Sequence, residues 1–341
     1  MRKLKQNNKL IVNDVTKIFS QRILLSRKYF KAVNKVSLEM DLDIPEVFSL
    51  VGESGSGKTT LANLILNIIE PDEGEIFFKG RDITKVKSKK DKMAFMKDVQ
   101  PVFQDPFESF DPMKKVEVFL YETVSNFEIA RRRSQVEAII EKALGMVGLS
   151  FNEVKGKYPG EFSGGQLQRI AIARSLAVGP SILIADEPVS MLDASLRISI
   201  VNLFKALKEQ QNLSVLYITH DLATAYYVSD RIGVMLRGNL VEVGKAKEIL
   251  DEPLHPYTQF LKQSVLEPDP DKKKLDILQK QEISATEVGE YQKEGCKFSG
   301  RCPKAMDICR EKEPGYYEPP GKGMIVKCFL YEPSWKNNET K

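Results

Sequence analysis

The chain has 341 residues, 42% of them hydrophobic and 29% charged, so it can bury sizeable cores and lacks the composition of a disordered chain. Its 51 basic and 47 acidic residues leave a net charge of +4, which excludes a protein that holds nucleic acid by a concentrated basic excess. Uncharged stretches such as 59–69 and 175–185 are eleven residues long, whereas a membrane helix needs about 20. At about 150 residues per domain, the length predicts about two domains. The basic first residues lead into polar sequence and not into an apolar signal core, so we expect the protein to stay in the cytoplasm.

Short apolar runs alternate with stretches of helical periodicity, which predicts a parallel sheet flanked by helices. Four runs lack polar alternation, as strands buried on both faces do: residues 47–51, 182–185, 215–219 and 232–236. Antiparallel strands are predicted at 74–78 and at 240–243, the latter joined to 232–236 by a hairpin turn at Arg237, Gly238 and Asn239. We therefore predict an α/β fold with a mixed sheet.

Helical patterning replaces the strand signal between about residues 105 and 165. It is clearest at 135–147, where apolar residues recur at helical spacing. We predict a helical subdomain inserted into an α/β domain of residues 1–250. The sequence then becomes rich in proline, charge and finally cysteine, so we expect residues 251–341 to form an extension without a large core of its own.

Residues 52–59 match the phosphate-binding pattern G-x-x-x-x-G-K-[ST], directly after the predicted strand 47–51 and before a predicted helix at 60–69. Glycines let this backbone curl closely around phosphate oxygens. Lys58 would contact the β- and γ-phosphates of ATP, and the Thr59 hydroxyl would ligate Mg²⁺. A merely structural glycine-rich turn is the alternative, but the full pattern arises by chance in about one chain in a hundred of this size. The residues expected to bind nucleotide here are Gly52, Ser54, Gly55, Ser56, Gly57, Lys58, Thr59 and Thr60.

Two carboxylates, Asp186 and Glu187, end the predicted strand 182–185, at the edge where open α/β sheets bind ligands. Asp186 would hold Mg²⁺, and Glu187 would act as the general base for the attacking water. A solvated acidic strand end is the alternative. Beside a phosphate loop we favour the catalytic interpretation.

Ser163, Gly164, Gly165 and Gln166 open a predicted helix at 166–177, and their backbone N–H groups suit an anion. The segment resembles the signature motif of ABC-type ATPases, and the alternative is an ordinary Ser-capped helix. The resemblance implies an ABC-type P-loop ATPase fold. It also implies that the signature of one subunit closes over the γ-phosphate held by the loop of the other.

Three further positions match this family. Gln104 resembles the glutamine that joins the core to the helical insertion and contacts Mg²⁺ and water. Asp193 lies in a segment similar to the loop that crosses the dimer seam, although Met191 stands where a small residue is usual. His220 resembles the switch histidine at the γ-phosphate.

The adenine of a bound nucleotide is expected to stack on an aromatic residue near the N-terminus. Phe19 is our first choice, and Tyr29 and Phe30 are the alternatives. The inserted stretch 20–31 separates these aromatic residues in the sequence.

Residues 51–55, 103–106 with 111–112, and 255–258 narrow the resemblance to the ATPase subunits of oligopeptide/dipeptide importers, the last-listed partner type in particular. The resemblance covers about residues 10–329 and departs at Pro45, where the family usually has glycine. It implies a second ATPase subunit, two membrane permeases fed by an extracytoplasmic peptide-binding lipoprotein, a place at the cytoplasmic face of the membrane, and no nucleic acid. The alternatives are an importer of nickel or another small solute, a soluble ABC ATPase acting on nucleic acid or ribosomes, and an ATP-binding scaffold without hydrolysis.

The only cysteines of the chain, Cys296, Cys302, Cys309 and Cys328, all lie in the extension, with five, six and eighteen residues between them. This spacing differs from the tight pairs of structural zinc sites, and Pro303 follows a cysteine as in ferredoxins. Residues 295–298 and 301–305 resemble the cysteine segment of peptide-importer ATPases, some of which carry an iron–sulfur cluster. We expect a structural [4Fe–4S] cluster, with zinc or free thiols as alternatives.

Overall fold

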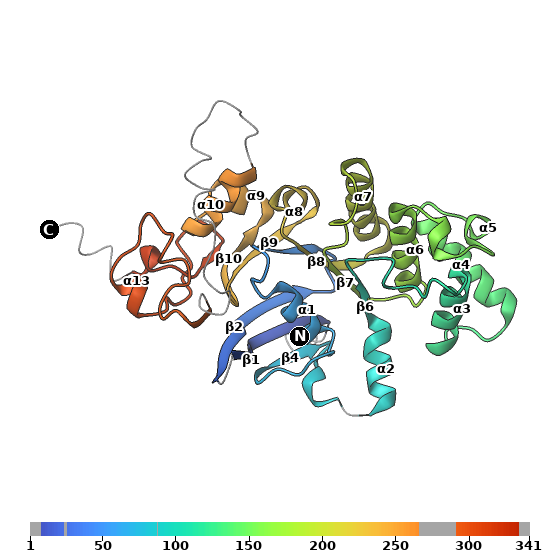
Figure 1. Cartoon of the computed structure of the whole chain (residues 1–341), viewed down its shortest axis with the longest axis horizontal. Helices are drawn as coiled ribbons and strands as arrows, with labels where there is room; N and C mark the ends of the chain where they lie inside the picture. Colours follow the sequence, from blue (N-terminus) through green and yellow to red (C-terminus); the bar gives the residue numbers. More distant parts are fainter. Residues whose placement is uncertain (1–7, 24–25, 87, 266–290, 334–341) are drawn as a thin grey trace.

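The computed structural model describes residues 8–23, 26–86, 88–265 and 291–333. Its larger sheet has seven strands in the order β11-β10-β9-β3-β8-β7-β6 (Figure 1). The bounds are β3 (Val47–Val51), β6 (Val99–Val102), β7 (Ile182–Asp186), β8 (Ser214–Thr219), β9 (Arg231–Leu236), β10 (Asn239–Lys245) and β11 (Ile325–Val326). Strands β9, β3, β8, β7 and β6 run parallel, whereas β10 and β11 are antiparallel to their neighbours. The prediction of a mixed α/β sheet is confirmed.

A second, antiparallel sheet has the order β2-β1-β4-β5. Its strands are β1 (Lys9–Ile23), β2 (Ser26–Asp41), β4 (Glu73–Phe78) and β5 (Arg81–Asp82). Strands β1 and β2 form one long hairpin in which Phe19 pairs with Phe30 and Ser20 with Tyr29. The stretch 20–31 therefore does not keep the aromatic residues apart, because strand pairing places Phe19 and Phe30 opposite each other.

Helices cover the larger sheet. They are α1 (Lys58–Ile65), α2 (Lys89–Asp98), α7 (Ala194–Gln211), α8 (Leu222–Val228), α9 (Ala246–Asp251) and α10 (Pro256–Val265), with a short 3-10 turn at Ile83–Lys85. The prediction that the first helix extends to residue 69 is wrong. Asn67 takes a left-handed backbone with φ of 54°, and its side-chain amide donates to the carbonyl of Ile83 at 3.1 Å, so the helix ends before it.

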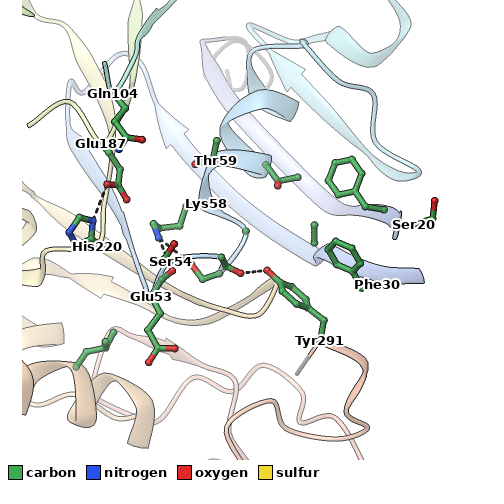
Figure 2. Close-up of a pocket in the computed structure, with 17 residues that line it drawn as sticks. Ser20, Phe30, Glu53, Ser54, Lys58, Thr59, Gln104, Glu187, His220 and Tyr291 are labelled. Carbon is green, nitrogen blue, oxygen red and sulfur yellow. Dashed lines mark hydrogen bonds and ion pairs between the residues drawn. The ribbon is translucent and has the colours of Figure 1, made fainter. Parts of the chain in front are cut away.

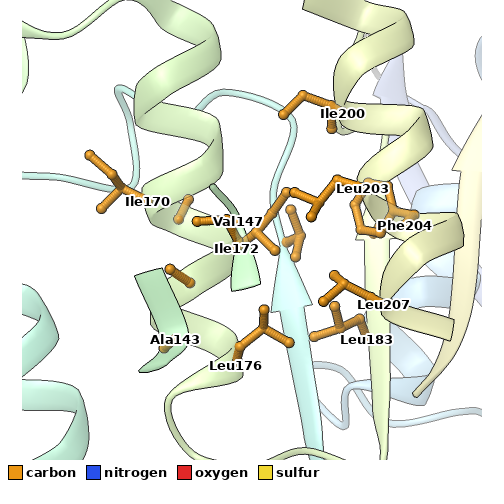
Figure 3. Close-up of a cluster of buried hydrophobic side chains, with 14 of the residues drawn as sticks. Ala143, Val147, Ile170, Ile172, Leu176, Leu183, Ile200, Leu203, Phe204 and Leu207 are labelled. Atoms are coloured by element: carbon orange, nitrogen blue, oxygen red, sulfur yellow. The ribbon is translucent and has the colours of Figure 1, made fainter. Parts of the chain in front are cut away.

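The segment between β6 and β7 is helical, as predicted. It contains α3 (Val116–Asn126), α4 (Arg133–Met146), α5 (Phe151–Val154), a 3-10 turn at Pro159–Glu161 and α6 (Gly164–Leu176). Helix α6 packs between α4 and α7, and apolar side chains from all three surround Leu183 of β7 (Figure 3). This shared core ties the helical subdomain to the strand that ends in Asp186.

Residues 291–333, here called the C-terminal segment, contain α13 (Ile308–Glu311), β11 and a 3-10 turn at Phe329–Tyr331. Its buried Phe298, Met324 and Val326 pack in one cluster with Ile249 and Tyr257. The segment therefore buries its apolar residues against the α/β core. Among the described residues, no helix has the length and apolar character needed to cross a membrane.

Candidate nucleotide-binding site

A cavity of about 1030 Å³ opens beside the loop between β3 and α1 (Figure 2). The loop needs glycine at two points because a Cβ at Gly52 would lie 2.2 Å from the carbonyl oxygen of Met235, and one at Gly57 would lie 2.2 Å from that of Ala32. Gly57 also has φ of 103°. The predicted site residues that line the cavity are Phe19, Ser54, Gly55, Ser56, Gly57, Lys58, Thr59, Thr60, Gln104, Glu187 and His220.

Lys58 is buried inside the curl of this loop. Its Nζ donates to the carbonyl oxygens of Gly52 at 2.8 Å and Glu53 at 3.0 Å. Burial lowers the pKa of Lys58, while the nearby charges of Glu187, Asp186 and Glu53 oppose that shift. A buried ammonium facing an open cavity is suited to an anionic ligand such as a polyphosphate.

Asp186 lies at the end of β7, and its Oδ1 is buried without a hydrogen-bond partner within the described part of the chain. Burial raises the pKa of Asp186, and a hydrogen bond from the Thr59 hydroxyl opposes that shift. A hydroxyl and an unpartnered carboxylate oxygen are the ligands that Mg²⁺ prefers. These residues fit the magnesium site that the sequence predicts.

Glu187 follows with a strained backbone, φ 47°, which its N–H bond to the carbonyl of Ile218 at 2.9 Å helps to hold. Its Oε2 lies 2.9 Å from Nδ1 of His220, which comes directly after β8. Figure 2 shows this pair and Gln104 grouped on one side of the cavity. Two neighbouring strands thus deliver a carboxylate and an imidazole to one point.

Aromatic rings line the other side of the cavity. The ring centroids of Phe19 and Phe30 are 6.2 Å apart, and those of Phe30 and Tyr291 are 5.2 Å apart. Tyr29 is 61% exposed and does not line the cavity, so the structure does not support it as the adenine platform. Phe19 and Phe30, which both line the cavity, are therefore the two candidates for stacking on adenine.

The sequence analysis missed five residues that line the cavity: Ser20, Ala32, Glu53, Leu261 and Tyr291. The Tyr291 hydroxyl donates to the carbonyl of Gly55, and its ring lies under the guanidinium of Arg237. Leu261 and Tyr291 lie far from the phosphate loop in sequence and outside any motif, so nothing in the sequence could have placed them there, whereas Glu53 occupies a variable position of the loop motif itself.

The signature residues lie elsewhere. Ser163 caps α6, with its hydroxyl accepting from the N–H of Gln166, whose side chain bonds back to the N–H of Ser163. Asp193 caps α7 by accepting from the N–H of Leu196 at 2.9 Å. Neither these residues nor Gly164 and Gly165 line the cavity. The start of α6 is thus formed but does not contribute to the cavity of its own chain.

The four cysteines surround a second, very small cavity together with Phe298 and Pro256. Burial raises the pKa of Cys296, Cys302 and Cys328, the last to about 12. Within the described ranges, however, no group of three or more His, Cys, Asp or Glu side chains is arranged to hold a metal ion. The structure thus brings the thiols around one cavity but does not arrange them as ligands of a metal ion.

Comparison with known proteins decides the family. Residues 34–190 match the family model "ABC transporter", and residues 241–309 match "Oligopeptide/dipeptide transporter, C-terminal region". The oligopeptide transport ATP-binding protein AppF of Bacillus subtilis is 40% identical, covering 96% of this chain and 98% of its own. The chain belongs to the ATP-binding subunits of oligopeptide/dipeptide ABC transporters.

Other members of these ATP-binding subunits are also similar. OppF of Streptococcus mutans is 44% identical over 74% of this chain and 79% of its own, and DppF of Lactococcus lactis is 41% identical over 70% and 76%. A dimeric post-hydrolysis structure of the ATP-binding cassette MJ0796 bound to ADP and Pi superposes with a TM-score of 0.60 at 27% identity. It covers 70% of this chain and 98% of that one. The chain is therefore an ABC transporter ATPase, as predicted.

Proposed function

We propose that this ATPase subunit binds ATP and Mg²⁺ in the 1030 Å³ cavity and uses hydrolysis to power the import of peptides. The observation that carries the proposal is convergence: the phosphate loop, Gln104, Glu187 and His220 all line that cavity, and the neighbouring Asp186 has a buried carboxylate oxygen without a partner among the described residues. Thr59, Gln104 and Asp186 would hold Mg²⁺, which would neutralise charge on the phosphate oxygens.

The protein's own groups divide the work. The loop N–H groups and Lys58 bind the triphosphate, and the ring of Phe19, tilted against that of Phe30, offers a surface to the adenine. Glu187 accepts the proton of the attacking water as general base. His220 positions Glu187 through the 2.9 Å contact between Nδ1 and Oε2. Because both residues sit on the ends of adjacent buried strands, their spacing is fixed before the substrate arrives.

We infer that a second ATPase subunit pairs with this one, because the signature residues lie away from the nucleotide cavity of their own chain. Ser163, Gly164, Gly165, Gln166 and Asp193 lie outside the cavity of their own chain, so they would act on nucleotide held by a partner. Two permeases and an extracytoplasmic peptide-binding lipoprotein would complete the transporter, and this ATPase subunit would lie at the cytoplasmic face of the membrane. The matched C-terminal family model and the relatives named for oligopeptide and dipeptide transport support peptides over nickel or nucleic acid. We further propose that residues 1–250 form the ATPase domain and residues 251–341 its C-terminal extension.

Replacement of the base tests the hydrolysis step. Glu187→Gln should keep nucleotide affinity, because the loop is intact, and should lower the rate of phosphate release about 10²–10⁴-fold, the usual contribution of a general base. Fluorescent nucleotide titration and a phosphate-release assay measure the two quantities. Glu209→Gln, an exposed carboxylate on α7, is the matched control. Parental hydrolysis in Glu187→Gln would remove Glu187 from the mechanism.

We also propose that the four cysteines ligate a structural [4Fe–4S] cluster. The support is their gathering around one cavity beside Phe298. Protein purified without oxygen should then be brown and should lose its visible absorption and its iron in Cys302→Ser. A colourless protein with one equivalent of zinc, or with no metal, would refute the cluster.

A further inference from the structure

An ion pair joins the phosphate loop to the C-terminal segment. The guanidinium of Arg301 donates through both Nη atoms to the two carboxylate oxygens of Glu53, at 2.8 and 3.0 Å, across 248 residues of sequence. Each of the two side chains is only 23% exposed. A forked, largely buried pair is stronger and more directional than an exposed one.

Glu53 is the residue through which this contact reaches the phosphate-binding groups. Its carbonyl oxygen accepts from Nζ of Lys58 at 3.0 Å and from the N–H of Ser56 at 3.1 Å. Its own N–H donates to the hydroxyl of Tyr257 on α10 at 3.0 Å. In Figure 2 the Glu53 carboxylate points away from Lys58, toward the ribbon of the C-terminal segment. The side chain of Glu53 thus faces the segment while its backbone shapes the loop.

Arg301 is itself fixed in place. Its guanidinium lies 5.2 Å from the ring centroid of Phe298 and 5.7 Å from that of Phe260. Phe298 is fully buried and packs edge-on against Tyr257, with ring centroids 5.4 Å apart. The backbone N–H of Arg301 donates to the carbonyl of Phe298 at 2.9 Å, which closes a turn directly before Cys302. The guanidinium of Arg301, which pairs with Glu53, is therefore held in place by packed aromatic rings.

We propose that Arg301 is a positioning residue for nucleotide binding: it holds Glu53, and through Glu53 the backbone of the phosphate loop, in the conformation that receives the triphosphate. The C-terminal segment would then set the ATP affinity of its own chain. The proposal rests on the proposed binding of ATP at this loop. Ordering the loop in advance removes part of the entropy cost of binding. Glu187 and His220 directly follow β7 and β8 and are not part of the phosphate loop, so the step after binding should not depend on Arg301.

Kinetics separate this role from a merely structural one. In the full chain, Arg301→Ala should raise KM and Kd for ATP about tenfold, the equivalent of about 1.4 kcal/mol, and leave kcat near its parental value. Arg301→Lys should fall between the two because an ammonium cannot form the forked pair. Lys322→Ala is the matched control, since Lys322 pairs the same segment with Glu252 away from the loop.

A double-mutant cycle keeps the test sharp even if one variant folds poorly. Glu53→Gln combined with Arg301→Ala should raise KM no further than Arg301→Ala alone, because both remove one interaction. A parental KM in Arg301→Ala, or an equal rise in Lys322→Ala, overturns the positioning role. Failure of the parental protein to bind ATP would instead refute the proposed function, so the two failures are distinguishable.

Discussion

The helical subdomain and the C-terminal segment flank the α/β core from opposite ends (Figure 1), and they relate to the nucleotide cavity in opposite ways. The subdomain carries the signature residues at the start of α6, outside the cavity of its own chain. The C-terminal segment instead contacts the phosphate loop directly, through Arg301 and Tyr291. The first region is arranged to serve a partner, and the second is arranged to serve the chain that contains it.

The largest expected effect separates hydrolysis from binding. Ser163→Arg should lower ATP hydrolysis about 100-fold by placing bulk and charge where α6 would meet the partner's nucleotide, since such contacts stabilise transition-state charge. Nucleotide affinity of the chain itself should not change, in contrast to Lys58→Ala, which should lose affinity. Phosphate release and fluorescent nucleotide titration provide the readouts.

Ser134→Arg, an exposed serine on α4, controls for added charge on the subdomain. If Ser163→Arg weakens nucleotide binding to its own chain as much as Lys58→Ala does, the distinction between the two regions fails.

Acid should lower the free energy of unfolding through His255, which lies on the C-terminal side of the molecule. His255 is buried at the start of α10, its Nδ1 accepts the N–H of Tyr257 at 3.0 Å, and burial lowers its pKa to about 3. The neutral imidazole is therefore the folded form. Its contribution to stability is complete above the ordinary pKa of about 6.5 and is lost as pH falls toward 3, at about 1.4 kcal/mol per pH unit.

Urea denaturation at a series of pH values measures that slope. His255→Asn keeps an acceptor for Tyr257 and cannot be protonated, so its free energy of unfolding should fall less steeply with acid than that of the parent. Equal slopes in the two proteins would show that other groups govern acid stability.

The smallest expected effect concerns the adenine of the bound nucleotide. Phe19→Ala should weaken ATP binding about fivefold, since a stacked aromatic contact contributes about 1 kcal/mol. Affinity for inorganic triphosphate should stay constant, because that ligand has no base to stack. Tyr29→Ala, in the neighbouring strand but outside the cavity, should change neither value. A loss of triphosphate affinity in Phe19→Ala would mean that Phe19 supports the loop and not the base.

Local pattern was enough to predict the strands that carry the site. Strand β3 spans the predicted residues 47–51, because an unbroken apolar run ends at a glycine of a recognisable loop. The long hairpin of β1 and β2 could not be predicted in the same way. Its register shifts between Val12 and Ile18, where Asp14 has φ of 47°, and such bulges break the alternation that identifies a strand.

Contacts across long sequence separations were also beyond prediction. Arg301 stands in a segment known for its cysteines, and nothing near it in the sequence points to Glu53. Only the folded chain brings these two residues together, because the intervening sheet, α9 and α10 set where the C-terminal segment lies. The motifs thus predicted most of the residues that line the nucleotide site, whereas the contacts that hold those residues in position depend on tertiary structure.

The short strand β11 has a consequence for synthesis and solubility. Ile325 and Val326 pair with Val243 and Glu242, so β11 covers the middle of the edge of β10, which would otherwise be the last strand on that side of the sheet. An uncovered edge offers its N–H and C=O groups to any neighbouring strand. On the ribosome, β10 therefore stays open to such pairing until residues 325–326 have emerged, and a chain that stops earlier would keep an aggregation-prone edge.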